Sequence, residues 1–532
     1  MQRLRIFLYL VALVLIFLLY NFEHQNQKSP NIEPVAVSDA VPKIAREYLH
    51  GDSSLGAQNK KIRIETDSIL LQIGANDAEI SSLRLKKYPS TDDRTKPMVL
   101  LSSETARPIL MRSSLTSGGG NTNSLELRFQ PKEIQKSQDG DKTVIPFVAK
   151  DKELSIEKIY TVKKGSYQVD LEYRISNTGA KRWKGGLDFL LLSPTPLPQK
   201  RGLKDIGPRS QQRIAISTPK SSFRSFTDKK ILKNPLEIGN LRKGWIALVQ
   251  HYFVYALIPD FPSARGESKI IQDYNLLQIG ANEIEINPSE TKIIKTKLYF
   301  GPKIPSLLAK SAPHLEHAIS FSWFWSLARF IIFLLGAIHS VCRNWGLSII
   351  ILTILIKLAL APLTRKGTES MAKMKNLRPK INRLKELYGD DRQKMSQELM
   401  SVYRKEGVNP LGGCLPMIIQ IPIFFTLYYV LFSSVELRYS SFLWIKDLTR
   451  YDPFFVLPLL IGGSMLLLQR LSPPVGDPVQ EKVMMFLPLM MTIIFLHFPA
   501  GLGFYMVTNN TVSFIQQWLV QRRLRKREKI RR

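Results

Sequence analysis

The chain has 532 residues, a formal net charge of +31 and a mean hydropathy of −0.07. Its two cysteines, Cys342 and Cys414, have no metal ligand near them at a useful spacing, so the composition argues against a disulfide framework and a cysteine metal site. Residues 24–318 are polar, whereas long apolar stretches dominate from residue 319 onward. The sequence therefore predicts an extramembrane part followed by a membrane part.

The first element is an apolar segment near the N-terminus. Basic residues precede the apolar run from Ile6 to Tyr20, and Asn21-Phe22-Glu23 follows in place of a small-x-small cleavage site. We interpret residues 1–21 as an uncleaved transmembrane anchor. Residues 22–59, rich in Pro, Ser, Asn and Gln, are predicted to form a flexible linker.

Short alternating segments separated by turn residues fill residues 60–302. Apolar and polar residues alternate over Lys61–Glu65, Tyr167–Ile175 and Lys292–Phe300. This pattern predicts a β-sandwich. The domain shows no nucleophile motif and no glycine-rich phosphate loop, although sequence alone leaves open a tethered carbohydrate-active or lytic enzyme with converging carboxylates.

Residues 303–343 are predicted to form a linker and an interfacial amphipathic helix. Their apolar part could be taken for a span, but its polar residues recur at helical steps. This polar stripe comprises Ser322, Ser326, Arg329, Gly336, Ser340 and Arg343. Counting the segment as a span would also place the basic segment 365–406 outside the cell, against the positive-inside rule, so we expect the helix to lie in the membrane interface.

The next apolar run, Trp345 to Leu363, is long enough to cross a hydrocarbon core of roughly 30 Å. Lys357 lies within it, and a charge at that depth costs from about 3 to more than 10 kcal/mol unless it meets water or a partner. We interpret Lys357 as the mark of a polar site inside the membrane. The alternative is a lysine that snorkels to the nearby end of the run.

Further apolar stretches complete a predicted six-span bundle, made of the N-terminal anchor and a five-span core. The spans after the anchor are predicted at 344–364, 413–432, 454–470, 483–498 and 502–520, with an external loop at 433–453. The basic loop 365–412, the basic tail 521–532 and the N-terminus then all lie in the cytoplasm.

Loop 365–412 carries helical periodicity on two arms joined by a turn at Gly389-Asp390-Asp391. Its apolar positions are Met371, Met374, Leu377, Ile381, Leu384, Tyr388, Met395, Leu399 and Tyr403. We expect a helical hairpin whose first arm is kinked at Pro379. The methionines either hold the two arms together or offer an adaptable apolar surface.

Polar side chains recur on several predicted spans. Thr353 shares a helix face with Lys357, and Gln420 shares one with Phe424 and Tyr428. The polar residues of the last span are Thr508, Asn509, Asn510, Ser513, Gln516 and Gln517. These residues either line a common aqueous recess or hydrogen-bond one helix to another, and the presence of Lys357 favours the recess.

The C-terminal run 522–532 contains eight Lys/Arg residues. It begins with the candidate binding residues Arg522, Arg523, Arg525, Lys526 and Arg527. Such a cluster is suited to ribosomal RNA or to anionic phospholipid headgroups. The alternative is that the charges only fix the orientation of the last span.

Five stretches carry a family resemblance. They are 345–364, MAKMKNLRPKINRLKELYGDD at 371–391, VNPLGGCLPMIIQIPIFFTLYYVL at 408–431, SVELR at 434–438 and FPAGLGFYMVTNN at 498–510. In this order and spacing, the chain closely resembles the Gram-negative members of the YidC/Oxa family of membrane protein insertases over nearly its whole length. The resemblance implies a multi-domain inner-membrane protein with a periplasmic β-sandwich, a five-span insertase core after the anchor and a cytoplasmic hairpin.

The resemblance also implies roles for individual residues. In this family a basic residue, usually arginine, sits in a hydrophilic groove that opens to the cytoplasm and the lipid. Lys357 occupies that position here, and lysine keeps the charge but lacks the planar fork of arginine. Gln420 matches another groove position, and Thr353, Asn509 and Asn510 are the further groove candidates. Pro422, Phe424 and Tyr505 match client-contact positions, and Tyr428 is grouped with them because it shares the face of Phe424.

The implied function is that of a non-enzymatic insertase and chaperone that inserts inner-membrane proteins, alone or with the Sec translocon. The expected partners are nascent inner-membrane proteins, the Sec translocon, the ribosome and anionic phospholipids. No Walker A sequence occurs, so we expect no nucleotide, and we predict no cofactor and no metal. The alternative is a secondary transporter for a small anionic solute, although the spans lack carboxylates and internal repeats.

Overall fold

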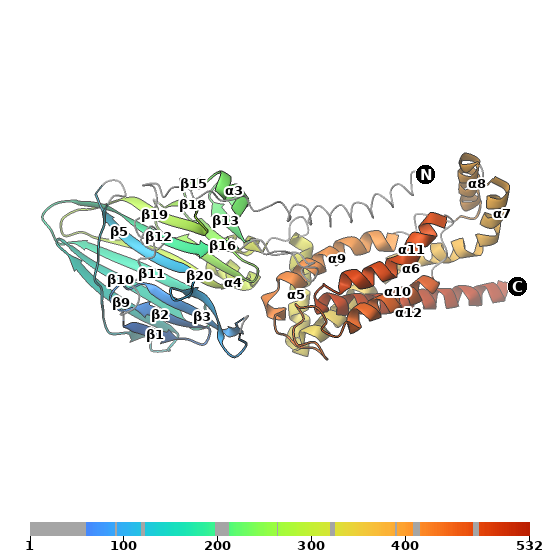
Figure 1. The fold of residues 1–532 in the computed structure, drawn as a ribbon, viewed down its shortest axis with the longest axis horizontal. Coiled ribbons are helices and arrows are strands. Elements are labelled where there is room, and N and C mark those ends of the chain that lie inside the picture. The colour runs from blue at the N-terminus through green and yellow to red at the C-terminus, as the bar shows by residue number, and fades with distance from the viewer. Residues whose placement is uncertain are drawn as a thin grey trace. The chain divides into compact units, whose positions relative to one another are not determined.

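The computed structural model describes residues 60–531 except 91–92, 119–122, 197–211, 263, 320–324, 389–390, 408–414 and 472–477. The predicted anchor 1–21 and linker 22–59 therefore lie outside the described residues, as does Ser322 of the polar stripe. The chain divides into two compact units, a β-rich unit that ends at Ile319 and a helical unit from residue 320 onward (Figure 1).

Three antiparallel sheets build the β-rich unit within the described residues. The largest has the order β14 (Ser221–Thr227), β13 (Arg213–Thr218), β16 (Trp245–Val249), β17 (Phe253–Pro259), β20 (Thr291–Pro302), β11 (Gln168–Asn177), β10 (Leu154–Lys163), β9 (Lys142–Asp151) and β7 (Gln130–Pro131), and β8 (Gln135–Lys136) also pairs with β9. The second has the order β15 (Leu236–Ile238), β18 (Arg265–Ile271), β19 (Tyr274–Ile286), β12 (Trp183–Pro194), β5 (Leu110–Ser117) and β6 (Asn123–Ser124). The third joins β1 (Lys61–Glu65), β2 (Ile69–Gly74), β3 (Ile80–Pro89) and β4 (Pro97–Ser102) in sequence order. Among the described residues of this unit, three short helices accompany the sheets, α3 (Asp228–Lys233), α4 (Pro305–Ser311) and the 3₁₀ helix η3 (Leu315–Ala318).

The alternating sequence pattern places one face of each large sheet in the core. On β11, Leu171 and Tyr173 are buried, whereas Arg174 is exposed. The ring of Tyr173 lies 6.0 Å from that of Phe189 on β12, and its hydroxyl shares a 2.8 Å hydrogen bond with Ser113 Oγ on β5. The two large sheets therefore pack face to face, and the predicted β-rich domain is confirmed.

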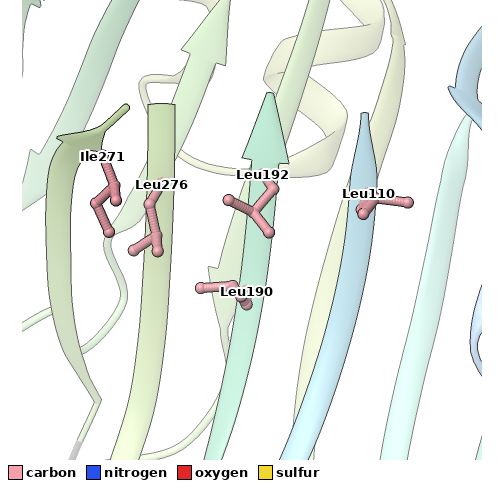
Figure 2. Close-up of a cluster of buried hydrophobic side chains, with 5 residues drawn as sticks. All are labelled: Leu110, Leu190, Leu192, Ile271 and Leu276. Atoms are coloured by element: carbon pink, nitrogen blue, oxygen red, sulfur yellow. The ribbon is translucent and has the colours of Figure 1, made fainter. Parts of the chain in front are cut away.

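The opposite face of the second sheet is also apolar. Five side chains from four adjacent strands gather there, as Figure 2 shows: Leu110, Leu190, Leu192, Ile271 and Leu276. Each of the five is at least 95% buried. Because β12 is covered on both faces, its sequence reads as a continuous apolar run rather than as an alternation.

A buried ion pair connects the three sheets. Lys158 on β10 is fully buried and donates to Glu79 Oε1, which precedes β3, at 2.5 Å. Glu79 also accepts from Ser113 Oγ at 2.9 Å. The rings of Tyr160 and Tyr173 lie 5.4 and 5.5 Å from the ammonium. Burial alone would lower the pKa of Lys158, but the Glu79 carboxylate and the two tyrosines raise it well above its usual value.

The helical unit contains α5 (Trp325–Cys342), α6 (Trp345–Asn376), α7 (Arg378–Tyr388), α8 (Arg392–Lys405), α9 (Leu415–Ser433), η6 (Val435–Leu437), α10 (Val456–Leu471), α11 (Pro478–Phe495) and α12 (Ala500–Arg531) (Figure 1). Among the described residues, one stretch is long and apolar enough to cross a membrane, Trp345–Arg365. Shorter apolar stretches are Ser326–Cys342, Gln420–Ser433, Val456–Leu471 and Met484–Phe495. The number of spans stays a prediction.

Helix α5 packs through one narrow face. Ala328, Ile331 and Leu335 are buried, and Phe330 and Phe333 project outward with 57% and 70% of their surface exposed. The described residues of the polar stripe are exposed except Gly336, which is half-buried. Exposed phenylalanines are favourable in apolar surroundings, and the interfacial location of this helix stays a prediction.

The predicted kink at Pro379 is instead a break between two helices. Helix α6 ends at Asn376, and α7 begins at Arg378 with Pro379 in its first turn. Proline has no N–H to donate and is tolerated in a first turn, where that donor has no intrahelical partner. Helix α8 begins after Asp391, whose side chain accepts from the backbone of Gln393 and Lys394.

The pair of helices α7 and α8 is held by aliphatic and aromatic contacts. Leu377 and Ile381 are buried against Leu399, Val402 and Tyr403. These five residues form the contact between the two helices that the structure describes. The side chains of Met371 and Met374 are not among the described ones, so the role of these methionines stays open.

Candidate functional site

Lys357 lies where α6 packs against α12. Its side chain is 9% exposed, and its ammonium donates to Ser513 Oγ on α12 at 2.9 Å. The Ser513 hydroxyl donates in turn to the carbonyl of Asn509 at 2.7 Å. Among the residues that the structure describes, no carboxylate forms an ion pair with Lys357. A positive charge is therefore held between two apolar helices by hydroxyl and carbonyl dipoles.

A second bond between the same helices lies beside this contact. Gln516 Nε2 donates to the backbone carbonyl of Lys357 at 3.3 Å. Because Asn509, Ser513 and Gln516 are three or four residues apart, α12 presents them on one face. All three residues were recognised from the sequence as polar residues of the last predicted span, but nothing in the sequence indicates that Ser513 is the hydrogen-bond partner of Lys357.

Asn509 and Asn510 continue this group of polar side chains toward α10. Asn510 Nδ2 donates to Ser464 Oγ on α10 at 3.0 Å, and Asn509 Nδ2 lies 3.4 Å from Asn510 Oδ1. Both asparagines are buried. Asn509 Oδ1 has no hydrogen-bond partner within the described part of the chain. Ser464 was missed from the sequence because a lone serine in an apolar stretch carries no periodic signal.

A separate polar contact joins α9 to α12. Gln420 Nε2 donates to the Tyr505 hydroxyl, and the Phe424 ring lies 6.4 Å from the Tyr505 ring. Tyr428 is buried against Phe498 at 5.6 Å between ring centroids. Of the four predicted client-contact residues, Phe424 and Tyr505 thus form an aromatic contact between α9 and α12, whereas Tyr428 on α9 contacts Phe498, which precedes α12.

Two of the predicted site residues form hydrogen bonds within their own helices. Thr353 is 2% exposed, and its hydroxyl donates to the Ile349 carbonyl at 2.6 Å instead of reaching Lys357. The carbonyl of Pro422 accepts from the Thr426 hydroxyl at 2.7 Å. Such bonds to the preceding turn satisfy a polar group in an apolar helix without a partner on another helix.

Helix α12 continues into the basic tail. Arg522, Arg523 and Lys526 are exposed, and the Arg522 guanidinium lies 5.3 Å from the Trp518 ring centroid. Arg525 and Arg527 belong to the same helix, but their side chains lie outside the description. The tail therefore carries its charges on a helix rather than on an extended chain.

An antiparallel β-rich domain joined to an apolar helical unit with a buried lysine defines a membrane protein with a large extramembrane domain. A family model described as the YidC periplasmic domain matches residues 61–334, and one described as 60Kd inner membrane protein matches residues 337–528.

Curated relatives match along most of their length. The membrane protein insertase YidC of Legionella pneumophila (strain Paris) is 38% identical over 487 residues, which cover 89% of this chain and 86% of that protein. The membrane protein insertase YidC of Coxiella burnetii (strain RSA 331 / Henzerling II) is 33% identical over 94% of this chain and 89% of that protein. A crystal structure of an active YidC insertase with its first transmembrane domain resolved covers 86% of this chain and 92% of that one, with 18% identity and a TM-score of 0.36.

The chain therefore belongs to the YidC family of membrane protein insertases, and the resemblance found in the sequence is confirmed. It is an inner membrane protein with a periplasmic β-rich domain and a helical membrane core.

Proposed function

We propose that this protein inserts nascent inner-membrane proteins by lowering the barrier for their polar segments, without covalent chemistry. The observation that carries the proposal is the buried ammonium of Lys357, which is held by Ser513. Family membership favours this function over the transport of a small anionic solute.

Lys357 lies twelve residues after Trp345 at the start of α6, or roughly 18 Å along the helix. A charge at this depth stabilises a polar or acidic segment that would otherwise lose its hydration in the membrane. We infer that a client's exported tail is held transiently beside Lys357, Thr353, Gln420, Asn509 and Asn510. These residues would line a groove open to the cytoplasm and the lipid.

The client's apolar span then partitions into the bilayer along α9 and α12. Pro422, Phe424, Tyr428 and Tyr505 are the proposed contacts. Burial of apolar surface supplies the driving force, on the order of 25 cal/mol per Å². The membrane potential assists the outward movement of an acidic tail by about 2.3 kcal/mol per charge per 100 mV.

The proposed topology has six spans with both termini in the cytoplasm. It places the β-rich domain and loop 433–453 in the periplasm, α5 in the periplasmic interface, and α7 and α8 in the cytoplasm. We propose the helical tail as a contact for ribosomes and anionic phospholipids, and the Sec translocon as a partner for some clients.

Insertion of acidic and neutral clients tests the role of Lys357. In cells depleted of the wild-type protein, the protease-accessible tail of one single-span client is measured in an acidic and a neutral version. We expect Lys357→Arg to be active, and Lys357→Leu and Lys357→Glu to impair translocation of the acidic tail more than that of the neutral tail. Arg329→Leu on α5 is the matched control, because it removes a basic residue from the same unit outside the proposed groove.

Equal translocation of both tails by the Lys357→Leu variant and the wild-type protein would reduce Lys357 to a snorkelling anchor. An equal loss in the Arg329→Leu control would show that the effect follows net charge rather than the position of Lys357.

A further inference from the structure

Three side chains with metal-ligating atoms meet in the last turn of the β-rich unit. His314, Glu316 and His317 lie at and within η3, and one ligand atom from each lies within 4.8 Å of the others. This turn is remote in sequence from the polar residues of the helical unit. Neither the family relationship nor the proposed insertion mechanism assigns it a role.

The turn brings the two imidazoles together. Leu315 and Ala318, three residues apart in η3, lie on one face of this short helix, and His314 directly precedes it as the N-cap residue. Leu315 and Ala318 are buried and anchor the turn, whereas His314 is exposed. The two imidazole rings are stacked, with centroids 5.8 Å apart and planes inclined by 21°.

The backbone around the turn is held by the β-rich unit. Trp245 Nε1 on β16 donates to the Pro313 carbonyl at 2.9 Å, and the Phe223 ring on β14 lies 6.2 Å from the His317 ring. His314 has a φ of 63°, in the left-handed region that histidine enters more readily than most residues. The ligand atoms are thus presented from a turn fixed at both of its flanks.

Glu316 adds a carboxylate, one oxygen of which lacks a hydrogen-bond donor in the described part of the chain. Its Oε2 atom is buried and has no hydrogen-bond partner among the described residues. A buried acceptor without a donor costs about 1–3 kcal/mol, and more when the group is charged. A cation placed between the carboxylate and the two imidazoles would remove that cost.

We propose that His314, Glu316 and His317 bind a divalent transition-metal ion, with Zn²⁺ as the expected occupant. Two imidazole nitrogens and one carboxylate oxygen suit zinc and copper, whereas calcium and magnesium prefer oxygen ligands alone. Zinc bound at about 2.0–2.1 Å needs ligand atoms roughly 3.4 Å apart, so atoms that lie within 4.8 Å of one another must close by at most about 1.4 Å. The exposed His314 side chain has the freedom to do so.

The bound ion would fix the turn that ends the periplasmic unit. A metal that binds the folded turn and not the unfolded chain stabilises the fold by mass action. The fourth coordination position would remain open to water, since the turn supplies three ligands.

Zinc binding to the full-length protein in detergent tests the proposal. The protein carries a purification tag without histidine, is stripped with a chelator and is titrated with Zn²⁺ against a chelating indicator. The variants are the double substitution His314→Asn with His317→Asn, and the single substitution Glu316→Gln. Asparagine tolerates the left-handed backbone of His314. His251→Asn, on a histidine of the same unit that packs against Tyr252, is the matched control.

We expect the wild-type protein and the His251→Asn control to bind one equivalent of zinc that the double variant lacks and that Glu316→Gln binds more weakly. Zinc should also raise the thermal unfolding temperature of the wild-type protein but not that of the double variant. Unfolding of the metal-free proteins at similar temperatures shows that the double variant folds. Equal zinc binding by the wild-type protein and the double variant, or by neither, overturns the proposal.

Discussion

Removing one partner of the buried Lys158–Glu79 pair should destabilise the β-rich domain strongly. Glu79→Gln keeps the shape of the side chain but leaves a fully buried ammonium without a counter-charge. Lys158→Met removes the ammonium and keeps the stem, but leaves the carboxylate buried. Breaking one partner of a buried ion pair costs about 3–5 kcal/mol. Because 1.4 kcal/mol is a factor of ten, the opening equilibrium should rise roughly 100- to 4,000-fold.

The double variant Glu79→Gln with Lys158→Met is the informative comparison. It leaves no charge uncompensated, so its loss of stability should be well below the sum of the two single losses. Hydrogen exchange in the full-length protein, followed by mass spectrometry on peptides from β10 and β11, measures the opening free energy of this core.

Two results would refute this reasoning. One is a Glu79→Gln variant whose exchange in β10 and β11 differs less than about tenfold from the wild-type rate. The other is a double variant as unstable as both single losses added together, since the pair would then contribute through packing rather than through charge.

Two further predictions concern a buried carboxyl and the basic tail. Burial raises the pKa of Asp188 to about 6 in the folded protein, above its value in the unfolded chain. The stability that the protonated carboxyl contributes is therefore fully present below about pH 4 and is lost as the pH rises through about 6. Asp188→Asn should therefore stabilise the domain in thermal unfolding at pH 7.5 by at most about 3 kcal/mol and have no such effect near pH 4, and equal effects at both pH values would contradict this. Deletion of 522–532 should weaken ribosome binding at low salt, and the wild-type binding should fall steeply with added salt. Unchanged binding by the deleted form would leave the tail only an orienting role.

Strands of the β-rich domain could be predicted from the sequence where one face of the strand is buried and the other faces solvent, because apolar and polar residues then alternate. Strand β11 alternates in sequence, and the structure follows it residue by residue. Lys158 lies at an inward position of β10, where a charge is unexpected without knowledge of Glu79 on a distant part of the chain. The order of the strands in the sheets could not be predicted from the sequence. For example, β20 lies between β17 and β11, and no local sequence signal encodes such long-range pairing.

Lys357 could be identified from the sequence because the cost of a charge in an apolar run is a local property. Its partner could not, because Ser513 lies 156 residues away and reaches Lys357 only through the packing of α6 on α12. The hydrogen-bond partner of Thr353 was not predicted either: its hydroxyl donates to the Ile349 carbonyl of its own helix, and its place in the groove stays a prediction.

The continuity of α12 has a mechanical consequence. From Ala500 to Arg531 the helix contains no proline, so it spans about 48 Å as one rod. A rotation of the basic end about the helix axis is transmitted along this rod toward Ser513, whose hydroxyl accepts from Lys357. Helix α6 has no such stiffness, since Pro362 interrupts its hydrogen-bond ladder five residues beyond Lys357. Torque applied at the basic end of α12 therefore has a continuous helical path to the hydroxyl that accepts from Lys357.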